Sequence, residues 1–416
     1  MTPRVLLPAV ATFYLVLVRA LRYRRRHAFI REYKRKHGAY NRDALSRMTV
    51  DDAWGVVTAL ITLEFPSIYT ASITFALFKT YGIPSISQLL VETGQLANDT
   101  TASKREADTG VLISEFVINP PDSARKFEGI ARMNYLHDRY RKAGKISDED
   151  MLYTLSLFAL EPVRWVSRYD WRKLTDLERS AMGVFWRDVG EVMGIPYGML
   201  EPYMGDYRDG LGWLEAMDKW SVAYEENFMV PADSNERLAQ GTLNVLMFNT
   251  PIFLRGFMLK LISALLEDRL RVAMRIEEPG SIHRRLISTL LILHAWAVRY
   301  THLPRPWWLR QKFFLDKPDP KTGKLYSAGY LAHPWYIKPT FWGRWGFEAL
   351  WTRMCGGYLP GDNGMEFHPD GYHIAEVGPE GQKGKGKLEM EKIKAQLMER
   401  RAAQGGCPMS MFTNGR

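Results

Sequence analysis

The sequence predicts an all-α protein with a helical body, long loops near its C-terminal end and a membrane helix at its N-terminus. Apolar residues recur at helical spacing through most of the chain, and strand-like alternation between turn signals is nearly absent. An uncharged apolar run at the N-terminus is followed by dense positive charge. The 416 residues, of which 46% are hydrophobic and 25% charged, are enough to bury a substantial core.

The N-terminal run, VLLPAVATFYLVLV, covers residues 5–18. As a helix it would reach about 21 Å, short of a hydrocarbon core of about 30 Å, and extension through Leu21 with Arg19 snorkelling narrows the gap. Because positive charge stays on the cytosolic side, residues 1–22 are interpreted as a single-pass anchor followed by a basic juxtamembrane segment over 23–50. An interfacial helix and a cleaved signal peptide are the alternatives; a signal peptide would carry its charge before the run.

The helical body is expected to cover residues 51–380. Helix-start signals stand at DDAWGVV, at Ser147 with Asp150 and at Thr175 with Glu178, each followed by apolar residues at helical spacing. The long periodic runs cover residues 101–118, 122–143, 148–169, 176–193, 235–248, 252–274 and 283–300. No internal repeat is present, so these runs predict one helical domain.

The C-terminal part of the chain has a different composition. Residues 304–379 are rich in Pro, Gly, Trp and Tyr, which predicts long ordered loops wrapped around the helices. The last segment, 381–416, is basic and then Gly-rich, and it is expected to be a flexible tail that contains one short amphipathic helix.

Charge and cysteine content exclude several classes of function. The net charge of +10 is concentrated near the two ends of the chain, which favours a membrane surface over nucleic acid as the partner. Two cysteines cannot form a disulfide framework, a zinc cage or an iron–sulfur site. A haem-thiolate enzyme would need a Phe- and Gly-containing loop before Cys355, where Glu348 and Trp351 stand instead. Walker, Rossmann, HExxH and serine-elbow motifs in a fitting context are absent from the sequence.

His137 is the first candidate for a metal ligand. In the run SARKFEGIARMNYLHDRYRKAGK, helical spacing places it on one stripe with Ile130, Asn134 and Arg141. An imidazole on such a stripe can project inward as a ligand. Taken alone, the pattern is more typical of a hydrogen-bonded structural histidine.

Two other groups of histidines are weaker candidates. The segment HPDGYH contains His368, Asp370 and His373, the ligand types of non-haem iron oxygenases. Those enzymes usually supply the second histidine from a β-barrel core, which this chain lacks, so a structured loop is the favoured interpretation. The third group has loose spacing and no carboxylate partner. It consists of His283, His294 and His302.

Several long stretches resemble one family, in the same order along the chain. They include LEFPSIYTASITFALFKTYGIPSISQLL, KREADTGVLISEF, YLHDRYRKAGKISDEDMLYTLSLFALEPVRW, PWYIKPTFWGRWG and GYHIAEVGP. The chain is similar through them to the catalytic-domain family of fungal MpaB-type, endoplasmic-reticulum-bound oxygenases and bacterial rubber oxygenases (latex-clearing proteins). The likeness runs from about residue 63 to residue 379 and includes the N-terminal anchor.

The resemblance implies a globin-like helical bundle around a pocket for haem b. It implies His137 as the axial iron ligand and Arg141, four residues later, as a second haem-binding and catalytic residue. Arg105 and Thr109 match the pair that the rubber oxygenases place over the other haem face. Asp108 stands where those enzymes carry a lysine, so the distal side departs from the family pattern. Arg105, Asp108 and Thr109 are the candidates for distal hydrogen bonding or proton handling.

The function that follows from the resemblance is oxidative cleavage of a C=C bond. The expected enzyme is a haem-dependent oxygenase that acts with O2 on a lipophilic, prenyl- or isoprenoid-like substrate in secondary metabolism. It would be a single-pass protein of the endoplasmic reticulum membrane, with its catalytic domain in the cytosol and without a nucleic-acid partner. A non-enzymatic, membrane-tethered helical scaffold and a non-haem iron oxygenase are the alternatives.

Overall fold

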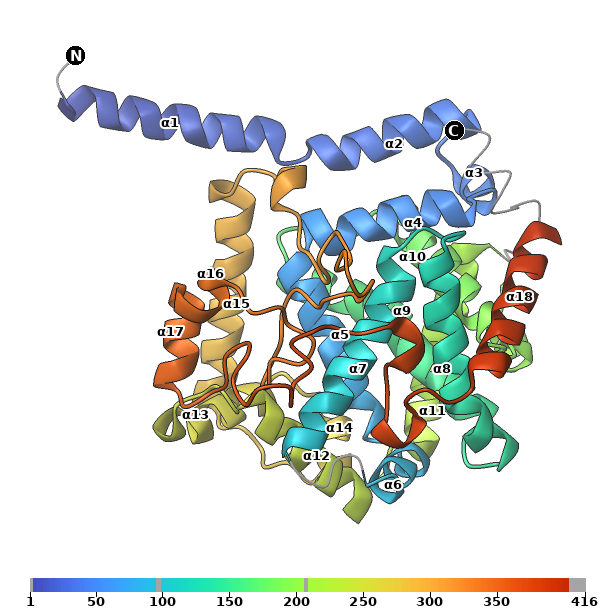
Figure 1. The fold of residues 1–416 in the computed structure, drawn as a ribbon. Coiled ribbons are helices and arrows are strands. Elements are labelled where there is room, and N and C mark those ends of the chain that lie inside the picture. Colours follow the sequence, from blue (N-terminus) through green and yellow to red (C-terminus); the bar gives the residue numbers. More distant parts are fainter. Residues whose placement is uncertain (1–2, 95–98, 206–208, 404–416) are drawn as a thin grey trace.

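The computed structural model describes residues 3–94, 99–205 and 209–403, and over these it confirms the all-α prediction (Figure 1). Within those ranges β-structure is limited to three isolated bridges among the C-terminal loops. The helices form a body with a long apolar helix projecting from one corner.

The N-terminal segment forms α1 (Pro3–Leu21), α2 (Arg24–His37) and α3 (Arg42–Ser46). Among the described helices, α1 and α2 together form one stretch, Leu6–His37, that is long and apolar enough to cross a membrane. Most of α1 projects away from the body, and near its middle the Tyr14 hydroxyl donates a hydrogen bond of 2.8 Å to the Thr301 carbonyl oxygen. The predicted apolar N-terminal helix is therefore present, and its C-terminal half contacts the body.

A bent pair of helices begins the core. Helix α4 (Val50–Ala59) starts at a capping box in which Thr49 and Asp52 satisfy each other's backbone N–H groups. A π-helical turn, Leu60–Glu64, leads into α5 (Pro66–Thr80) through a bend of 108°. The pair is apolar enough to pass for a broken membrane span, but most of its side chains are buried by other helices, so we assign it to the core of the body.

The central helices agree closely with the predicted periodic runs. The helices are α6 (Pro84–Glu92), α7 (Asp99–Ile118), α8 (Ala124–Lys142), α9 (Asp148–Tyr169), α10 (Asp176–Val192), α11 (Gly210–Phe228) and α12 (Asp233–Leu246). The predicted starts at Ser147 and Thr175 are confirmed, because each hydroxyl accepts a hydrogen bond from the backbone N–H three residues later. Helices α6 and α11 were not predicted as periodic runs.

The C-terminal part contains helices of very different length, and between α15 and α18 only short helices occur in long loops, as predicted for residues 304–379. In order they are α13 (Ile252–Ser263), α14 (Asp268–Ala273), α15 (Ser281–Thr301), η3 (Trp307–Leu309), α16 (Phe341–Trp345), α17 (Phe347–Met354), η4 (Ile374–Glu376), η5 (Glu380–Gln382) and α18 (Lys387–Ala403). The single helical run predicted over residues 252–274 is interrupted in the structure and forms two helices, α13 and α14. At the break, Glu267 lies outside either helix and its carboxylate pairs with the buried Lys79 ammonium at 2.8 Å.

The helix predicted within the tail is present as α18, and it is longer and better packed than expected. Helix α18 packs against α8, and its Met390 and Leu397 are buried. The buried guanidinium of Arg132 in α8 donates to the carbonyl oxygens of Val377 and Gln382, which holds the chain that leads into α18. The segment expected to be a flexible tail is therefore part of the folded body as far as Ala403.

A close crossing of α10 and α11 depends on Gly183. A Cβ atom added there would lie 1.8 Å from the backbone oxygen of Gly210, so the two helices could not keep their separation. We expect Gly183→Ala to lower the free energy of unfolding by about 1–3 kcal/mol. Gly55→Ala in α4 is the matched control, because its added methyl group meets nothing within 4 Å and removes a helix-destabilising glycine. Thermal melts of both variants check the prediction; equal melting temperatures would contradict it.

Candidate functional site

An apolar cavity of about 330 Å³ lies within the helical body. Its walls come from α5, α6, α7, α8, α9, α10 and α12, represented by Phe78, Leu89, Phe116, His137, Leu155, Trp186 and Val245. A cavity of only ~10–15 Å³ can hold one water molecule, so this cavity is large enough for a large organic group. Among its polar side chains, Arg105, Glu106, Asp108 and Thr109 come from α7, and His137, Arg139 and Tyr140 come from α8.

His137 lies in the wall of this cavity, on the helix that starts at the Ser123 cap. Burial lowers the pKa of His137 to about 4, and the nearby charges of Arg105 and Arg141 act in the same direction. The imidazole is therefore neutral at physiological pH, the form that binds a metal ion. Its Nδ1 is buried and has no hydrogen-bond partner among the described residues. A neutral imidazole with a buried nitrogen that has no hydrogen-bond partner is compatible with a ligand role at this site.

Helix α7, which packs against α8, contributes a polar part of the cavity wall. Arg105 and Thr109, the two residues predicted for the distal side, both line the cavity. Arg105 is also close enough to His137 for its charge to lower the histidine's pKa. The structure therefore brings the predicted pair and His137 to one cavity.

Asp108 is held by other residues, although it also contributes to the cavity wall. Its Oδ2 accepts a hydrogen bond of 2.9 Å from the Lys104 ammonium, and its Oδ1 accepts one of 2.6 Å from the Tyr336 hydroxyl. Lys104 in turn donates to the Gly378 carbonyl oxygen at 2.8 Å. These contacts assign Asp108 a structural role, joining α7 to the C-terminal loops, whereas its predicted distal role stays a prediction.

Arg141 is outside the set of side chains that line the cavity. Its guanidinium donates to the carbonyl oxygens of Met193 and Gly194, at 3.1 and 3.0 Å, and forms an ion pair with Asp148. These contacts fix the end of α8 against the end of α10. Arg141 therefore acts on His137 through its charge and through the position of α8, and its predicted direct contact with a cofactor stays a prediction.

Glu106 is a cavity residue that the sequence analysis did not single out. It precedes Thr109 by three positions, so the two residues lie on the same helical face, and the Glu106 side chain forms part of the cavity wall. Burial raises the pKa of Glu106 to about 7, and the charge of Asp108 raises it further. A carboxyl group that titrates near neutral pH in a cavity wall can donate or accept a proton there.

Glu106 should make stability depend on pH. The pKa of Glu106 is higher in the folded state than in the unfolded chain. The resulting stabilisation of the folded state is therefore fully present below the ordinary glutamate pKa and is lost as pH rises through about 7. We expect the melting temperature of the wild type, minus that of Glu106→Gln, to fall between about pH 5 and about pH 8. Glu226→Gln, at a side chain 58% exposed, is the control that should show no such trend. A difference independent of pH would contradict the prediction.

The other histidine groups do not form metal sites. Among the described residues, no three His, Cys, Asp or Glu side chains gather in a way that could hold a metal ion. His368 faces Glu380 at 3.5 Å, Asp370 pairs with Lys324, and the side chain of His373 is exposed. The three residues considered for non-haem iron therefore do not converge on one point, and His283, His294 and His302 likewise form no cluster.

The fold and the site together define a helical protein with one histidine directed at an apolar cavity. The family model described as "ER-bound oxygenase mpaB/B'/Rubber oxygenase, catalytic domain" matches residues 70–300, which include α7, α8 and the cavity residues discussed above. The chain belongs to this family, and the resemblance seen in the sequence is confirmed.

Three curated relatives agree with this membership. The ER-bound oxygenase mpaB' of Penicillium brevicompactum is 40% identical over 395 residues, which cover 95% of this chain and 92% of the relative. The ER-bound oxygenase mpaB of the same fungus is 38% identical, covering 86% and 84%. The mpaB of Penicillium roqueforti is 41% identical, covering 63% and 86%. These similarities support an oxygenase role, and the relatives' description as ER-bound agrees with the candidate membrane helix.

Proposed function

We propose that the chain is a membrane-anchored, haem-dependent oxygenase that cleaves a C=C bond of a lipophilic, isoprenoid-like substrate, with haem b held by His137. The observation that carries the proposal is the neutral imidazole of His137, whose buried Nδ1 lacks a partner, in the wall of a large apolar cavity. Bound haem would supply the oxygen chemistry, as in other haem proteins with a histidine ligand.

The chain's own residues have three tasks in this proposal. The apolar walls, from residues such as Leu112 and Phe158, bind the substrate chain and exclude water. Arg105 supplies positive charge and hydrogen-bond donors on the α7 side, and the Thr109 hydroxyl can orient a polar group there. The Glu106 carboxyl group can hold or release a proton at the same wall near pH 7.

The proposed reaction balances without an added reductant, since an alkene and O2 together contain the atoms of two carbonyl groups. We further propose a position in the endoplasmic reticulum membrane, with α1 as a single span and the body on the cytosolic side, because the basic residues follow the apolar run. A bilayer-soluble substrate would then be available next to the enzyme. Secondary metabolism is the expected setting of this activity.

An absorption spectrum with metal analysis tests the proposal. The full chain, purified in detergent, should show a Soret band and one haem iron per chain, and with O2 it should convert an isoprenoid chain to carbonyl fragments detectable by mass spectrometry. Iron without porphyrin would favour the non-haem alternative. A colourless and iron-free protein, obtained from cells supplied with haem precursor, would favour the scaffold.

A further inference from the structure

We propose that the body carries a second membrane-binding surface, which lies against the same bilayer that α1 enters. This surface, called the lateral face below, is formed by α13, α15, η3, α16 and α17. The proposal goes beyond the oxygenase reaction and adds a defined orientation of the body on the lipid. It rests on α1 being a membrane helix, and the experiments below separate the two statements.

The lateral face exposes an unusual number of large apolar side chains. Helix α15, although 21 residues long, has no buried residue, and the same holds for η3 and α16. Phe253, Trp308, Trp342 and Phe347 are each at least 75% exposed. Further members are Ile252, Ile282, Ile292, Leu293, Trp296, Trp307, Trp345, Trp351 and Met354. Exposed apolar surface on this scale marks a binding surface, and a high content of Trp is typical of the interface between lipid headgroups and hydrocarbon.

The charges on the lateral face are almost entirely positive. The segments 252–263, 281–310 and 341–354 contain nine Lys or Arg residues and a single acidic one, Glu348. A surface that exposes both Trp and Arg side chains is suited to binding a bilayer with anionic headgroups, because basic residues are attracted to those headgroups. A second copy of this chain is the less suitable partner, because a two-fold contact would place this positive face against itself.

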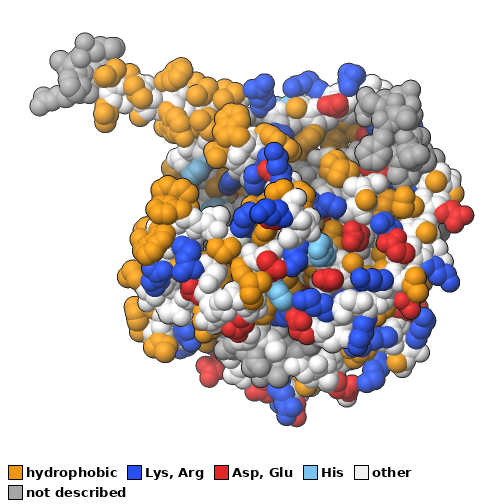
Figure 2. Space-filling model, in the orientation of Figure 1, with side chains coloured by type: hydrophobic (Ala, Val, Ile, Leu, Met, Phe, Trp, Pro, Cys, Tyr) orange, Lys and Arg blue, Asp and Glu red, His pale blue; other side chains and the backbone are white. Residues whose placement is uncertain are grey.

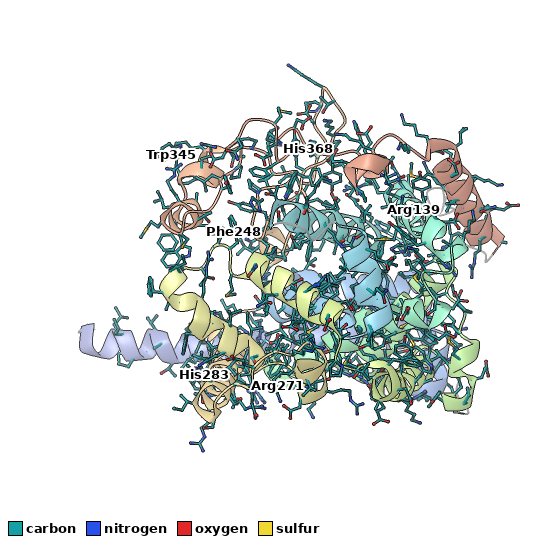
Figure 3. All side chains as sticks on the ribbon, turned by 90° about the horizontal axis from the view of Figure 1, so that it is seen from below. Arg139, Phe248, Arg271, His283, Trp345 and His368 are labelled. Carbon is teal, nitrogen blue, oxygen red and sulfur yellow. The ribbon has the colours of Figure 1, made fainter. Side chains whose placement is uncertain are left out.

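The lateral face points in the same direction as the free end of α1. In Figure 1, α15, α16, α17 and α13 lie at the end of the body past which α1 projects. Figure 3, seen from below, places Trp345 and His283 at that same end. Figure 2 shows hydrophobic side chains over both α1 and the adjoining part of this face. A membrane crossed by α1 would therefore meet the lateral face.

The attachment of α1 to the body places the apolar part of α1 and the lateral face at the same depth relative to a membrane. Tyr14 bonds to Thr301 at the end of α15, and Val18 is buried against the body. Of the described residues of α1, only 3–13 are then free of the body, about 17 Å of helix against a hydrocarbon core of about 30 Å. For the apolar residues between Tyr14 and Leu21 to be in lipid, the end of α15 must lie in the bilayer interface as well.

Labelling with an environment-sensitive fluorophore tests the contact. In the full chain with Cys355→Ser and Cys407→Ser, single cysteines at Phe253→Cys and Trp342→Cys carry the label. Leu388→Cys is the matched control, because Leu388 is 86% exposed on α18, at the opposite end of the body. In vesicles of phosphatidylcholine and phosphatidylserine with spin-labelled lipid, the first two labels should be quenched and the third should not. Absence of quenching at positions 253 and 342, or equal quenching at 388, would overturn the proposal.

A variant with a disabled anchor separates the lateral face from α1. The full chain with Leu7→Glu, Val10→Glu and Phe13→Glu, all exposed positions of α1, should still float with the same vesicles. Adding Trp307→Ser, Trp308→Ser and Trp342→Ser should lower its partitioning at least about tenfold, since each immersed aromatic side chain contributes on the order of that factor. Leu388→Ser in the same background should change nothing. An anchor variant that stays in solution contradicts the proposal while leaving the oxygenase function untouched. In the labelled chains, shielding of the labels at positions 253 and 342 by self-association before lipid is added would contradict it as well.

Discussion

Replacing His137 with Ala is expected to abolish the Soret band of the purified protein and, with it, O2-dependent conversion of substrate. The cavity offers no second histidine in its wall, so an axial ligand lost at position 137 is not replaced by a neighbour among the lining residues. The neutral imidazole with an unpartnered buried nitrogen is the feature that the substitution removes. The measurement is the ratio of Soret to protein absorbance in wild type and variant, purified side by side.

Two further variants distinguish loss of a ligand from loss of the fold. His137→Gly should regain a Soret band when imidazole is added, because the exogenous ring can occupy the vacated space. His373→Ala, at an exposed side chain from the segment considered for non-haem iron, should keep the full band. Full haem retention in His137→Ala would refute the ligand assignment, and loss of iron on His373→Ala alone would favour the non-haem alternative.

Local sequence signals were sufficient to predict most of the helical body. Helix starts at Ser147 and Thr175 depend on contacts within four residues, so they can be read from the sequence. The break between α13 and α14 could not be predicted from the sequence, because it accompanies the pairing of Glu267 with Lys79, 188 positions away. Helix α18 similarly gains its order from contacts with α8, which no local pattern reveals.

The candidate site was predictable where helical spacing decides which side chains point inward. Spacing within α8 was consistent with an inward His137, and the same rule applied to α7 from Thr109 would have found Glu106 three positions earlier. The partners of Asp108 and Arg141 were hidden, because Tyr336 and the Met193 carbonyl lie 228 and 52 positions away. The resemblance identified the residues, and only the structure shows which of them are already engaged by other partners.

Replacing Lys79 with Met is expected to lower the free energy of unfolding by about 3–5 kcal/mol. The Lys79 ammonium is buried in α5 and lies 2.9 Å from a Glu225 carboxylate oxygen and 2.8 Å from one of Glu267. Glu161 is 3.5 Å away and also pairs with Arg164. Without the ammonium, carboxylates from α9, from α11 and from the residue before α14 remain close together with too little positive charge, while methionine preserves most of the side chain's volume.

The loss should shrink as pH falls, which separates charge imbalance from poor packing. In the variant the clustered carboxylates repel one another, so their pKa values rise in the folded state and protonation relieves the repulsion. A packing defect alone would cost the same at each pH. Chemical unfolding of the wild type and of Lys79→Met at about pH 5 and about pH 8 measures the loss of unfolding free energy at each pH. Lys145→Met is the matched control, because Lys145 pairs with Glu92 at side chains 52% and 46% exposed and should contribute only about 0–1 kcal/mol. Equal destabilisation by the two variants would show that the buried cluster is not what joins α5, α9 and α11.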